Sequence, residues 1–422
     1  MPRMWCMMPC TPCWSPVAET MGHPVQPHPS AGPGVPMSAL RVCLFCEYLY
    51  PVVSRGRVPI AGGAEVQLAL TGRALAQAGC EVSVVTCDFG QPDRLHVDGM
   101  TLLRAYPPQS RIPIVRFVHP RLTRGLAALH RADADVYMFQ GGGLWAGLVR
   151  DLAAARGRAF VWMVAHDHDV ESHLPDVRGP RDRFWARRAI RLADAVVSQT
   201  EHQRRRLAES FGRDSVVIHN PVELPASDLV VDAGGDPSVV WLATYKPSKR
   251  PAWFTRFAER HPQVRCRMAG AIPPPPLDDV EWCAARAMAE RLPNLEVSPT
   301  IPHERVGEFL RGSTLFAHSS PSEGFPNAFL EAWANGLPSV TAFDPDGIIE
   351  REGLGACRND YDAWEHEIER RLADPALRRA EGARARHRAE TRHASAVVVG
   401  RLREVLCDSH DRASSRRGAR RG

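Results

Sequence analysis

The chain has 422 residues, of which 44% are hydrophobic and 24% are charged, and its formal net charge is +5. A chain of this length can form two domains with a full core each, and its composition is ordinary for a globular protein. The mild positive charge argues against a dedicated nucleic-acid binder, and the lack of an apolar run of about 18 residues argues against a membrane span.

The first 40 residues are rich in Met and Pro and have no periodic pattern. We interpret residues 1–40 as a disordered or mis-called N-terminal extension, with Met37 as the actual start. No apolar segment follows a basic start, so no signal peptide is expected. Cys6, Cys10 and Cys13 have the C-x3-C-x2-C spacing of some iron–sulfur enzymes, which leaves such an enzyme as an alternative. The other cysteines are scattered, and a cytoplasmic protein is the simplest expectation.

Short apolar runs alternate with helical segments from residue 41 onward. Strands are expected at 41–49, 81–87, 134–140, 159–165, 195–200 and 216–220, and helices at 64–79, 184–192 and 201–212. This alternation predicts parallel β-α-β units and a doubly wound sheet over residues 41–222. Residues 223–237 are rich in Pro, Gly and Asp and indicate a linker between domains.

The same alternation restarts in a second domain, expected over residues 238–385. Its strands are expected at 238–245, 264–270, 294–300 and 314–319, with helices at 252–261, at 304–313 and after residue 326. A C-terminal helix at 386–407 and a solvated basic tail at 408–422 complete the expected organisation. The chain therefore predicts two doubly wound, Rossmann-like domains that face each other across a cleft at the carboxyl ends of their strands.

Gly62 and Gly63 follow the first expected strand and open a helix, in the sequence IAGGAE. A glycine-rich turn exposes backbone N–H groups, and the N-terminus of a helix favours anions. The pair matches neither the G-x-G-x-x-G pattern nor a Walker loop, so a plain turn is the alternative to an anion site.

The stretch HSSPSEGFPNAFLEAWANGLPSV, residues 318–340, carries the strongest functional pattern. Glu323 lies in a loop after a strand, and Glu331 lies more than one turn inside the next helix, whose first turn suits Pro326 and whose end suits Gly336. Two carboxylates on either side of a helix N-terminus fit a ligand that has hydroxyls on both sides of a phosphate, as a nucleotide sugar does. The alternative is a helix-terminal acid and a solvated Glu.

The 53 basic residues include two lysines, Lys246 and Lys249, which lie within YKPSKRP at 245–251. A general preference for Arg, as in GC-rich bacteria, explains why lysine is rare but not why the two are clustered. We infer that this segment requires a compact ammonium group rather than a planar guanidinium.

The stretch EGFPNAFLEAWANG, residues 323–336, resembles the Glu-x7-Glu signature of retaining glycosyltransferases of the GT-B fold, specifically glycosyltransferase family four (group 1 glycosyl transferases). Further matches follow in the family's order: GGAE, AHD, ADAVVSQT, VIHNPV, the lysine segment and DPDG. The resemblance covers about residues 41–405. It implies retaining transfer of a hexose from a UDP- or GDP-linked donor to a glycan or lipid-linked acceptor in bacterial polysaccharide biosynthesis, with no cofactor besides the nucleotide sugar and no metal.

The resemblance also implies which residues contact the donor. Lys249 matches the family lysine that reaches the diphosphate, whereas Lys246 is a neighbour in the loop. Members often have Arg where this chain has Thr244, so Thr244 or Arg250 is expected to replace it. The implied donor-binding set is Gly62, Gly63, Thr244, Lys249, Arg250, Glu323, Gly324, Phe325, Pro326, Asn327 and Glu331.

His166 matches a histidine that many members place near the reacting centre, so the implied catalytic set is Glu323, His166 and Lys249. His166 to Asp169 also suggests a metal site, but adjacent side chains on so short a stretch cannot all converge on one ion. The Arg-rich segments RRAIRL and HQRRRL indicate either solvated helix faces or peripheral contact with the inner membrane face. Two alternatives remain on the same fold, a nucleotide-sugar epimerase and a catalytically silent nucleotide-binding homologue.

Overall fold

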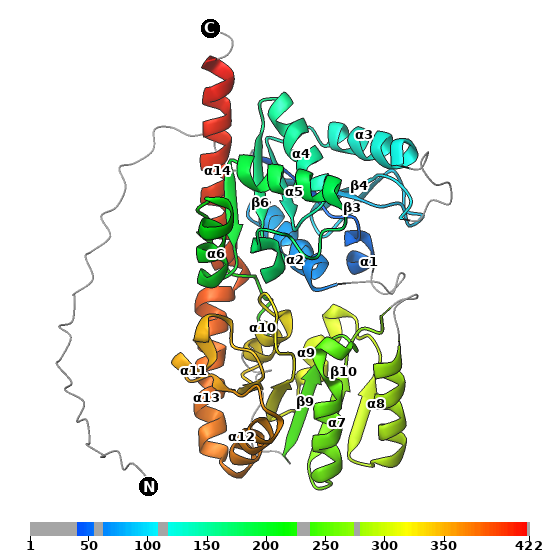
Figure 1. Cartoon of the computed structure of the whole chain (residues 1–422), viewed down its shortest axis with the longest axis vertical. Coiled ribbons are helices and arrows are strands. Elements are labelled where there is room, and N and C mark those ends of the chain that lie inside the picture. Colours follow the sequence, from blue (N-terminus) through cyan, green and yellow to red (C-terminus); the bar gives the residue numbers. More distant parts are fainter. Residues whose placement is uncertain (1–39, 55–61, 109–116, 226–236, 274–278, 420–422) are drawn as a thin grey trace, which may run out of the picture. The chain divides into compact units, whose positions relative to one another are not determined.

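The computed structural model describes residues 40–54, 62–108, 117–225, 237–273 and 279–419 (Figure 1). The chain divides into two units, residues 1–34 and 35–422, and all of the described residues belong to the second. The expected N-terminal extension and its three cysteines therefore lie outside the described residues, except for Leu40 at the end of the extension. Most of the expected linker, residues 226–236, lies outside them as well.

The first sheet has eight strands in the order β3-β4-β2-β1-β5-β6-β7-β8. All neighbouring strands are parallel except β3 and β4, which are antiparallel. The sequence pattern predicted most of these strands but not the antiparallel edge strand β3. The strand bounds are β1 Arg41–Phe45, β2 Glu81–Thr86, β3 Arg94–Val97, β4 Met100–Arg104, β5 Val136–Gln140, β6 Ala159–Met163, β7 Ala195–Ser198 and β8 Val216–Val217.

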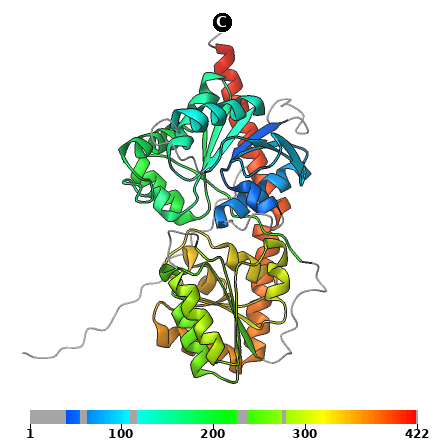
Figure 2. The same ribbon diagram turned by 90° about the vertical axis from the view of Figure 1, so that its right-hand side faces the viewer.

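Helices cover both faces of the first sheet, because successive strand residues point to opposite faces and both sets are apolar. In β1, Cys43 and Phe45 pack into the core on one face, and Val42 and Leu44 pack into the core on the other. Figure 2 shows the strands between the two helical layers. The elements between the strands are α1 Leu49–Val53, α2 Gly63–Gln77, η2 Phe117–Leu122, α3 Thr123–Ala132, α4 Leu144–Ala155, η3 Asp167–Val170, α5 Pro180–Leu192 and α6 Glu201–Phe211.

The second sheet has six parallel strands in the order β11-β10-β9-β12-β13-β14. Its strands are β9 Ser238–Leu242, β10 Arg265–Ala269, β11 Leu295–Ser298, β12 Leu315–His318, β13 Ser339–Thr341 and β14 Gly355–Cys357. Its helices are α7 Pro251–Arg260, α8 Val280–Arg291, α9 Val306–Leu310, α10 Asn327–Ala334, α11 Ile348–Arg351, α12 Tyr361–Ala373 and α13 Pro375–Arg388. Four short turns complete it, η5 Pro247–Lys249, η6 His303–Arg305, η7 Pro345–Gly347 and η8 Ala389–His393. The two sheets, parallel except for the edge strand β3, confirm the predicted architecture of two Rossmann-like domains.

The C-terminal helix differs from its predicted bounds. Instead of one helix at 386–407 and a solvated tail from 408, α13 ends at Arg388 and α14 runs over Ser395–Ala419. Helix α14 packs on the first sheet, where Val398, Leu402 and Leu406 join the core of α2 and β1. Ser409 and Ala413 are also buried, so the residues beyond 407 continue the packed helix up to Ala419.

Candidate active site

A pocket of about 360 Å³ lies at the carboxyl ends of strands in the second sheet. Its walls come from the end of α1, the start of α2, the residues after β9, β10 and β11, and the start of α10. Parallel α/β sheets bind ligands at this edge, because the loops there are free to vary and helix N-termini point toward it. Of the predicted donor-binding residues, Gly62, Gly63, Asn327 and Glu331 line the pocket.

The start of α2 is held against the start of α10 by one side chain, Asn327. Its Nδ2 donates to the Gly63 carbonyl at 2.8 Å, and its Oδ1 accepts from Gln67 Nε2 at 2.6 Å. A Cβ atom added to Gly62 would lie 2.4 Å from the Glu65 carboxylate, so Gly62 leaves room for this acid at the first turn of α2. The two glycines and the helix terminus that were predicted separately therefore meet in one place.

Glu331 contacts His303, a residue that the sequence pattern did not single out. His303 Nδ1 lies 3.1 Å from Glu331 Oε1, and both side chains are largely buried. Burial opposes the charged form of His303, but the hydrogen bond and negative charge of Glu331 outweigh it and raise the pKa of His303. His303 follows β11 at the same sheet edge. A histidine shortly after a predicted strand of this sheet could have been proposed as a site residue from the sequence.

Lys249 forms an ion pair with Glu323. Lys249 ends the turn η5, where its carbonyl accepts from Ser319 Oγ at 2.6 Å, and its Nζ donates to Glu323 Oε1. His318, the last residue of β12, places Nε2 3.6 Å from the same carboxylate oxygen. The sequence pattern had not assigned a role to His318.

The charges of this trio follow from burial and from the Lys249 ammonium. Burial raises the pKa of Glu323, but the charge of His318 when protonated, the charge of Lys249 and hydrogen bonds from Lys249 and Ser320 outweigh it, so the pKa of Glu323 lies below its ordinary value. Burial lowers the pKa of His318 to about 4. His318 is therefore neutral at pH 7, and Lys249 is the cation that keeps Glu323 ionised.

His166 lies beside the loop that carries Glu323. A Cβ atom added to Gly324 would lie 3.3 Å from His166 Cα and 3.2 Å from the Ala165 carbonyl oxygen, so the two loops approach each other closely here. Asp169 orients the His166 loop by accepting hydrogen bonds from the backbone N–H groups of Ala165 and His166. His166 Nδ1 accepts from the His168 N–H, which places the hydrogen of the neutral ring on Nε2.

The neighbouring acids and His168 have other partners. Asp167 accepts from Gln203 Nε2 at 2.9 Å, and His168 Nδ1 lies 2.9 Å from Asp176 Oδ2. His166, His168 and Asp176 offer ligand atoms within 4.8 Å of one another, a combination with Asp176 that the sequence pattern did not indicate. Asp169 is not part of this group and accepts hydrogen bonds from the loop backbone instead.

Thr244, Arg250, Phe325 and Pro326, which were also predicted to bind the donor, do not line the pocket. The Thr244 carbonyl accepts from the Lys246 N–H at 2.8 Å. Arg250 instead donates to Asn359 Oδ1 at 2.7 Å and stacks over Trp253, outside the pocket lining. Phe325 is buried, and its carbonyl accepts from Asn220. Pro326 has extended backbone and precedes the first residue of α10, so it lies one position outside the helix that it was expected to open.

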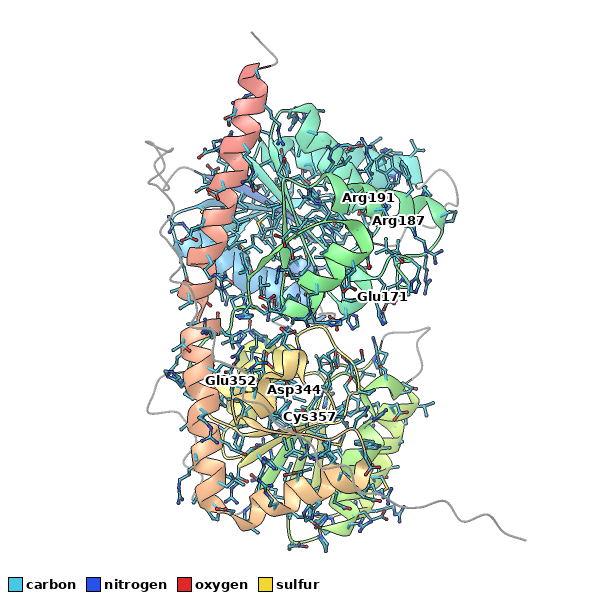
Figure 3. All side chains as sticks on the ribbon, turned by 60° about the vertical axis from the view of Figure 1, so that its left-hand side comes forward. Glu171, Arg187, Arg191, Asp344, Glu352 and Cys357 are labelled. Atoms are coloured by element: carbon cyan, nitrogen blue, oxygen red, sulfur yellow. The ribbon has the colours of Figure 1, made fainter. Side chains whose placement is uncertain are left out.

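The basic segments have largely local partners, which on α6 are Glu201 for Arg204 and Glu209 for Arg206. On α5, Arg187 donates to the Ser172 carbonyl and Arg188 pairs with Asp151, whereas Arg191 is exposed. Figure 3 shows Arg187 and Arg191 on this helix, and Glu171 in the loop before it. No helix in the described part of the chain is both long enough and apolar enough to cross a membrane.

Comparison with known proteins connects this geometry to two family models. Residues 61–225 match Glycosyltransferase Family 4, and residues 236–374 match Glycosyl transferases group 1. A curated relative, an exopolysaccharide phosphotransferase of Streptomyces coelicolor, is 28% identical over 300 residues, which cover 67% of this chain. The chain spans about 29% of the length of that relative.

Several solved structures have the same fold. A sucrose-phosphate synthase from Thermosynechococcus elongatus has a TM-score of 0.69 at 19% identity, with 87% of this chain and 98% of that chain covered. HepE of Anabaena, solved in complex with UDP-glucose, has a TM-score of 0.65 at 15% identity, with 87% and 99% covered. The catalytic domain of starch synthase IV from Arabidopsis thaliana, bound to ADP and acarbose, has a TM-score of 0.64 at 14% identity, with 88% and 100% covered.

The matched domains, the two Rossmann-like sheets and the site at their strand ends lead to one conclusion: this chain belongs to the group 1 glycosyltransferases, with a Family 4 domain before the group 1 domain, on the GT-B fold.

Proposed function

We propose that this protein is a retaining hexosyltransferase that transfers a hexose from a nucleoside-diphosphate sugar to a glycan or lipid-linked acceptor, without a metal. The observation that carries the proposal is the Lys249–Glu323 pair. Its residues lie in the segments after β9 and before α10, and Ala243, at the start of the first segment, and Asn327, directly after the second, line the pocket together with Gly63 and Glu331. A fixed ammonium, an ionised carboxylate and a helix N-terminus at one sheet edge suit a ligand with a diphosphate between two groups of hydroxyls.

Each residue then has a defined task in donor binding. Lys249 and the N–H groups at the start of α10 stabilise the diphosphate as the sugar leaves, which is when electrostatic stabilisation counts most. Glu331 accepts from the ribose hydroxyls, and its bond to His303 holds the carboxylate in place for this contact. Glu323 accepts from the hexose hydroxyls, and its lowered pKa keeps it an acceptor at neutral pH.

The reaction breaks the bond from C1 of the hexose to the β-phosphate oxygen and forms a bond from C1 to an acceptor hydroxyl oxygen on the same face. The transition state is oxocarbenium-like, as in other glycosyl transfer. The bonding electrons leave with the nucleoside diphosphate, which also takes the proton of the acceptor hydroxyl. Glu323 is not a nucleophile in this scheme, and His166 orients the hexose near the reacting centre.

Structures of similar proteins with bound nucleotides support a nucleoside-diphosphate donor. HepE was solved with UDP-glucose, and starch synthase IV was solved with ADP. We therefore expect UDP-, GDP- or ADP-linked hexoses among the donors, a site in bacterial polysaccharide biosynthesis, and action in the cytoplasm or at the inner face of the membrane.

The deciding experiment begins with thermal unfolding of the full chain in the presence of UDP, GDP, ADP and their hexose conjugates. A ligand at 100 times its Kd should stabilise the protein by about 2.7 kcal/mol. The stabilising donor is then incubated with candidate glycan acceptors, with and without EDTA, and the new linkage is identified by NMR.

A product with the anomeric configuration of the donor, formed at the same rate with EDTA, supports the proposal. An inverted product, or a rate abolished by EDTA and restored by a divalent cation, would contradict it. Free nucleotide and an epimerised sugar without any acceptor would indicate the epimerase. Binding without turnover for any donor and acceptor would indicate the silent homologue.

A further inference from the structure

A second pocket lies at the edge of the first sheet where β6 begins, opposite the edge where β6 leads to His166. It has a volume of about 350 Å³ and lies where α4 ends, β6 begins and the last turns of α14 pass. β6 starts at Ala159 beside this pocket and ends at Met163, shortly before His166. A strand of five residues spans roughly 16 Å, so the pocket is separate from the candidate active site.

The lining of this pocket is strongly basic. Five of its residues are arginines, and Asp194 is the one acid. Arg416 pairs with Asp194 in the lining, and Arg158 and Arg150 pair with Asp135 and Asp151 outside it. The other two arginines are Arg156 and Arg417.

Arg156 and Arg417 have no carboxylate partner within the described ranges of the chain. Arg156 donates to a neutral group, the Tyr137 hydroxyl, at 3.4 Å. The stem of Arg417 packs over Gly157, where an added Cβ atom would lie 3.0 Å from Arg417 Cδ. Arg156, Gly157 and Arg417 therefore line one concave surface.

We propose that this pocket binds a phosphate group through Arg156 and Arg417. The planar guanidinium fork matches the oxygen geometry of phosphate, and charge-assisted hydrogen bonds of this kind are about twice as strong as neutral ones. The pocket is large enough for a small phosphorylated ligand. The phosphate comes either from a soluble phosphorylated molecule or from the headgroup of an anionic lipid. This inference does not depend on the proposed function.

A purely structural explanation makes a different prediction. Helices α4 and α5 end beside the pocket and α14 ends just beyond it, and arginines near helix C-termini offset the negative end of the helix dipole. If the two arginines do only this, their removal lowers the unfolding temperature but leaves anion affinity unchanged. The experiment therefore has to measure affinity directly, because a loss of stability alone does not distinguish the two explanations.

The test uses the full chain in a Lys249→Ala background, which weakens anion binding at the candidate active site. Pyrophosphate is titrated calorimetrically into this protein and into the same protein with Arg156→Gln and Arg417→Gln. The charge-matched control carries Arg205→Gln and Arg379→Gln, two exposed arginines on α6 and α13. A further pair of substitutions, Arg156→Lys and Arg417→Lys, keeps the positive charge at the helix ends but removes the planar guanidinium groups.

We expect the glutamine pair to weaken pyrophosphate binding at least about tenfold, the lysine pair to weaken it several-fold, and the control pair to change it by less than about twofold. Equal affinity in all of these proteins would overturn the proposal, unless the vesicle arm below depends on the same two arginines.

A second arm distinguishes the two sources of phosphate. Phosphatidylcholine vesicles with and without phosphatidylglycerol are sedimented with each variant. Binding to the anionic vesicles that the glutamine pair loses assigns the phosphate to a lipid headgroup. Pyrophosphate binding that depends on the two arginines, without such vesicle binding, assigns it to a soluble ligand. If neither binding depends on Arg156 and Arg417, the pocket is not a phosphate site.

Discussion

At the scale of single residues, the two lysines of this Arg-rich chain differ sharply in their surroundings. Lys246 is exposed, whereas Lys249 is largely buried and bonds to Glu323. A flexible ammonium can shift between a carboxylate and a phosphate in a way that a planar guanidinium cannot. Under the proposed function, this position gives a reason for a lysine at 249, and the structure provides no comparable reason for Lys246.

We predict that Lys249→Ala lowers kcat by about 100-fold or more, because one charged donor to the leaving group contributes about 2.7 kcal/mol or more to the transition state. The measurement is steady-state kinetics with the donor identified by thermal shift. Lys246→Ala is the matched control and should keep kcat within about twofold. Equal losses in the two variants would contradict a specific role for Lys249.

His318 shows how a buried group makes stability depend on pH. It is 1% exposed, its ring meets Phe329 edge-on, and its Nδ1 has no hydrogen-bond partner in the described residues. Burial lowers the pKa of His318 to about 4, whereas an unfolded histidine titrates near 6.5. Between these values the unfolded state binds more protons than the native state, so stability falls as the pH falls.

We predict that the free energy of unfolding decreases as the pH is lowered from about 6.5 to about 4, and that His318 contributes about 3 kcal/mol of this decrease. His318→Leu should therefore have a flatter pH dependence than the parent protein. Urea unfolding at several pH values measures both slopes. Since His219 and His393 also have pKa values lowered by burial, some slope should remain. Identical slopes would show that His318 is not neutral in the native state.

At the scale of elements, the pocket in the candidate active site depends on the close approach between the carboxyl ends of β9 and β10. Gly270 follows β10, and a Cβ atom there would lie 1.5 Å from the Ala243 carbonyl oxygen, just after β9. No side chain fits between the two strand ends, and Gly270 also lines the pocket. The register of the second sheet therefore determines the shape of the site.

We predict that Gly270→Ala destabilises the protein by about 3 kcal/mol or more, because the clash is with backbone rather than with a flexible side chain. Chemical denaturation measures the change. Gly307→Ala, on α9 where an added Cβ meets nothing within 4 Å, is the matched control. It should change stability by less than about 1 kcal/mol, in the stabilising direction. A tolerated Gly270→Ala would mean that the strand ends can separate.

Particular elements show how far sequence reasoning reaches at this scale. Helix α10 and strand β12 were predicted closely, because Gly336 and the apolar periodicity mark their ends and faces. Strand β3 was missed, since RLHV has only four residues and pairs at the sheet edge. The His303–Glu331 bond and the orientation of Arg250 toward Asn359 are contacts between residues far apart in the chain, and periodicity carries no information about them.

At the scale of the whole molecule, α14 makes the end of the chain part of the first core. Its apolar residues pack with α2, β5 and β6, on the face opposite α4 and α5 (Figure 1). Two adjacent valines on this helix differ only in which way they point. Val398 is 3% exposed, whereas Val397 is 40% exposed.

We predict that Val398→Ala lowers the free energy of unfolding by about 2 kcal/mol, from the two lost methyl groups and the cavity that they leave. Val397→Ala should change it by less than about 0.5 kcal/mol. Urea denaturation followed by tryptophan fluorescence compares the two. An equal effect of both substitutions would mean that α14 is not docked on the first sheet in solution.

The sequence was sufficient for the two-domain α/β architecture and for the Glu323–Glu331 segment, because strand and helix periods, glycines and prolines are local signals. The docking of α14 required the tertiary structure. Residues 408–419 are mostly polar, and Ser409 and Ala413 become buried only because the first sheet offers a surface of the right shape. The same holds for the charge of Glu323: its sequence position shows a carboxylate, and only the structure brings it the Lys249 ammonium, which acts against burial and helps to lower its pKa.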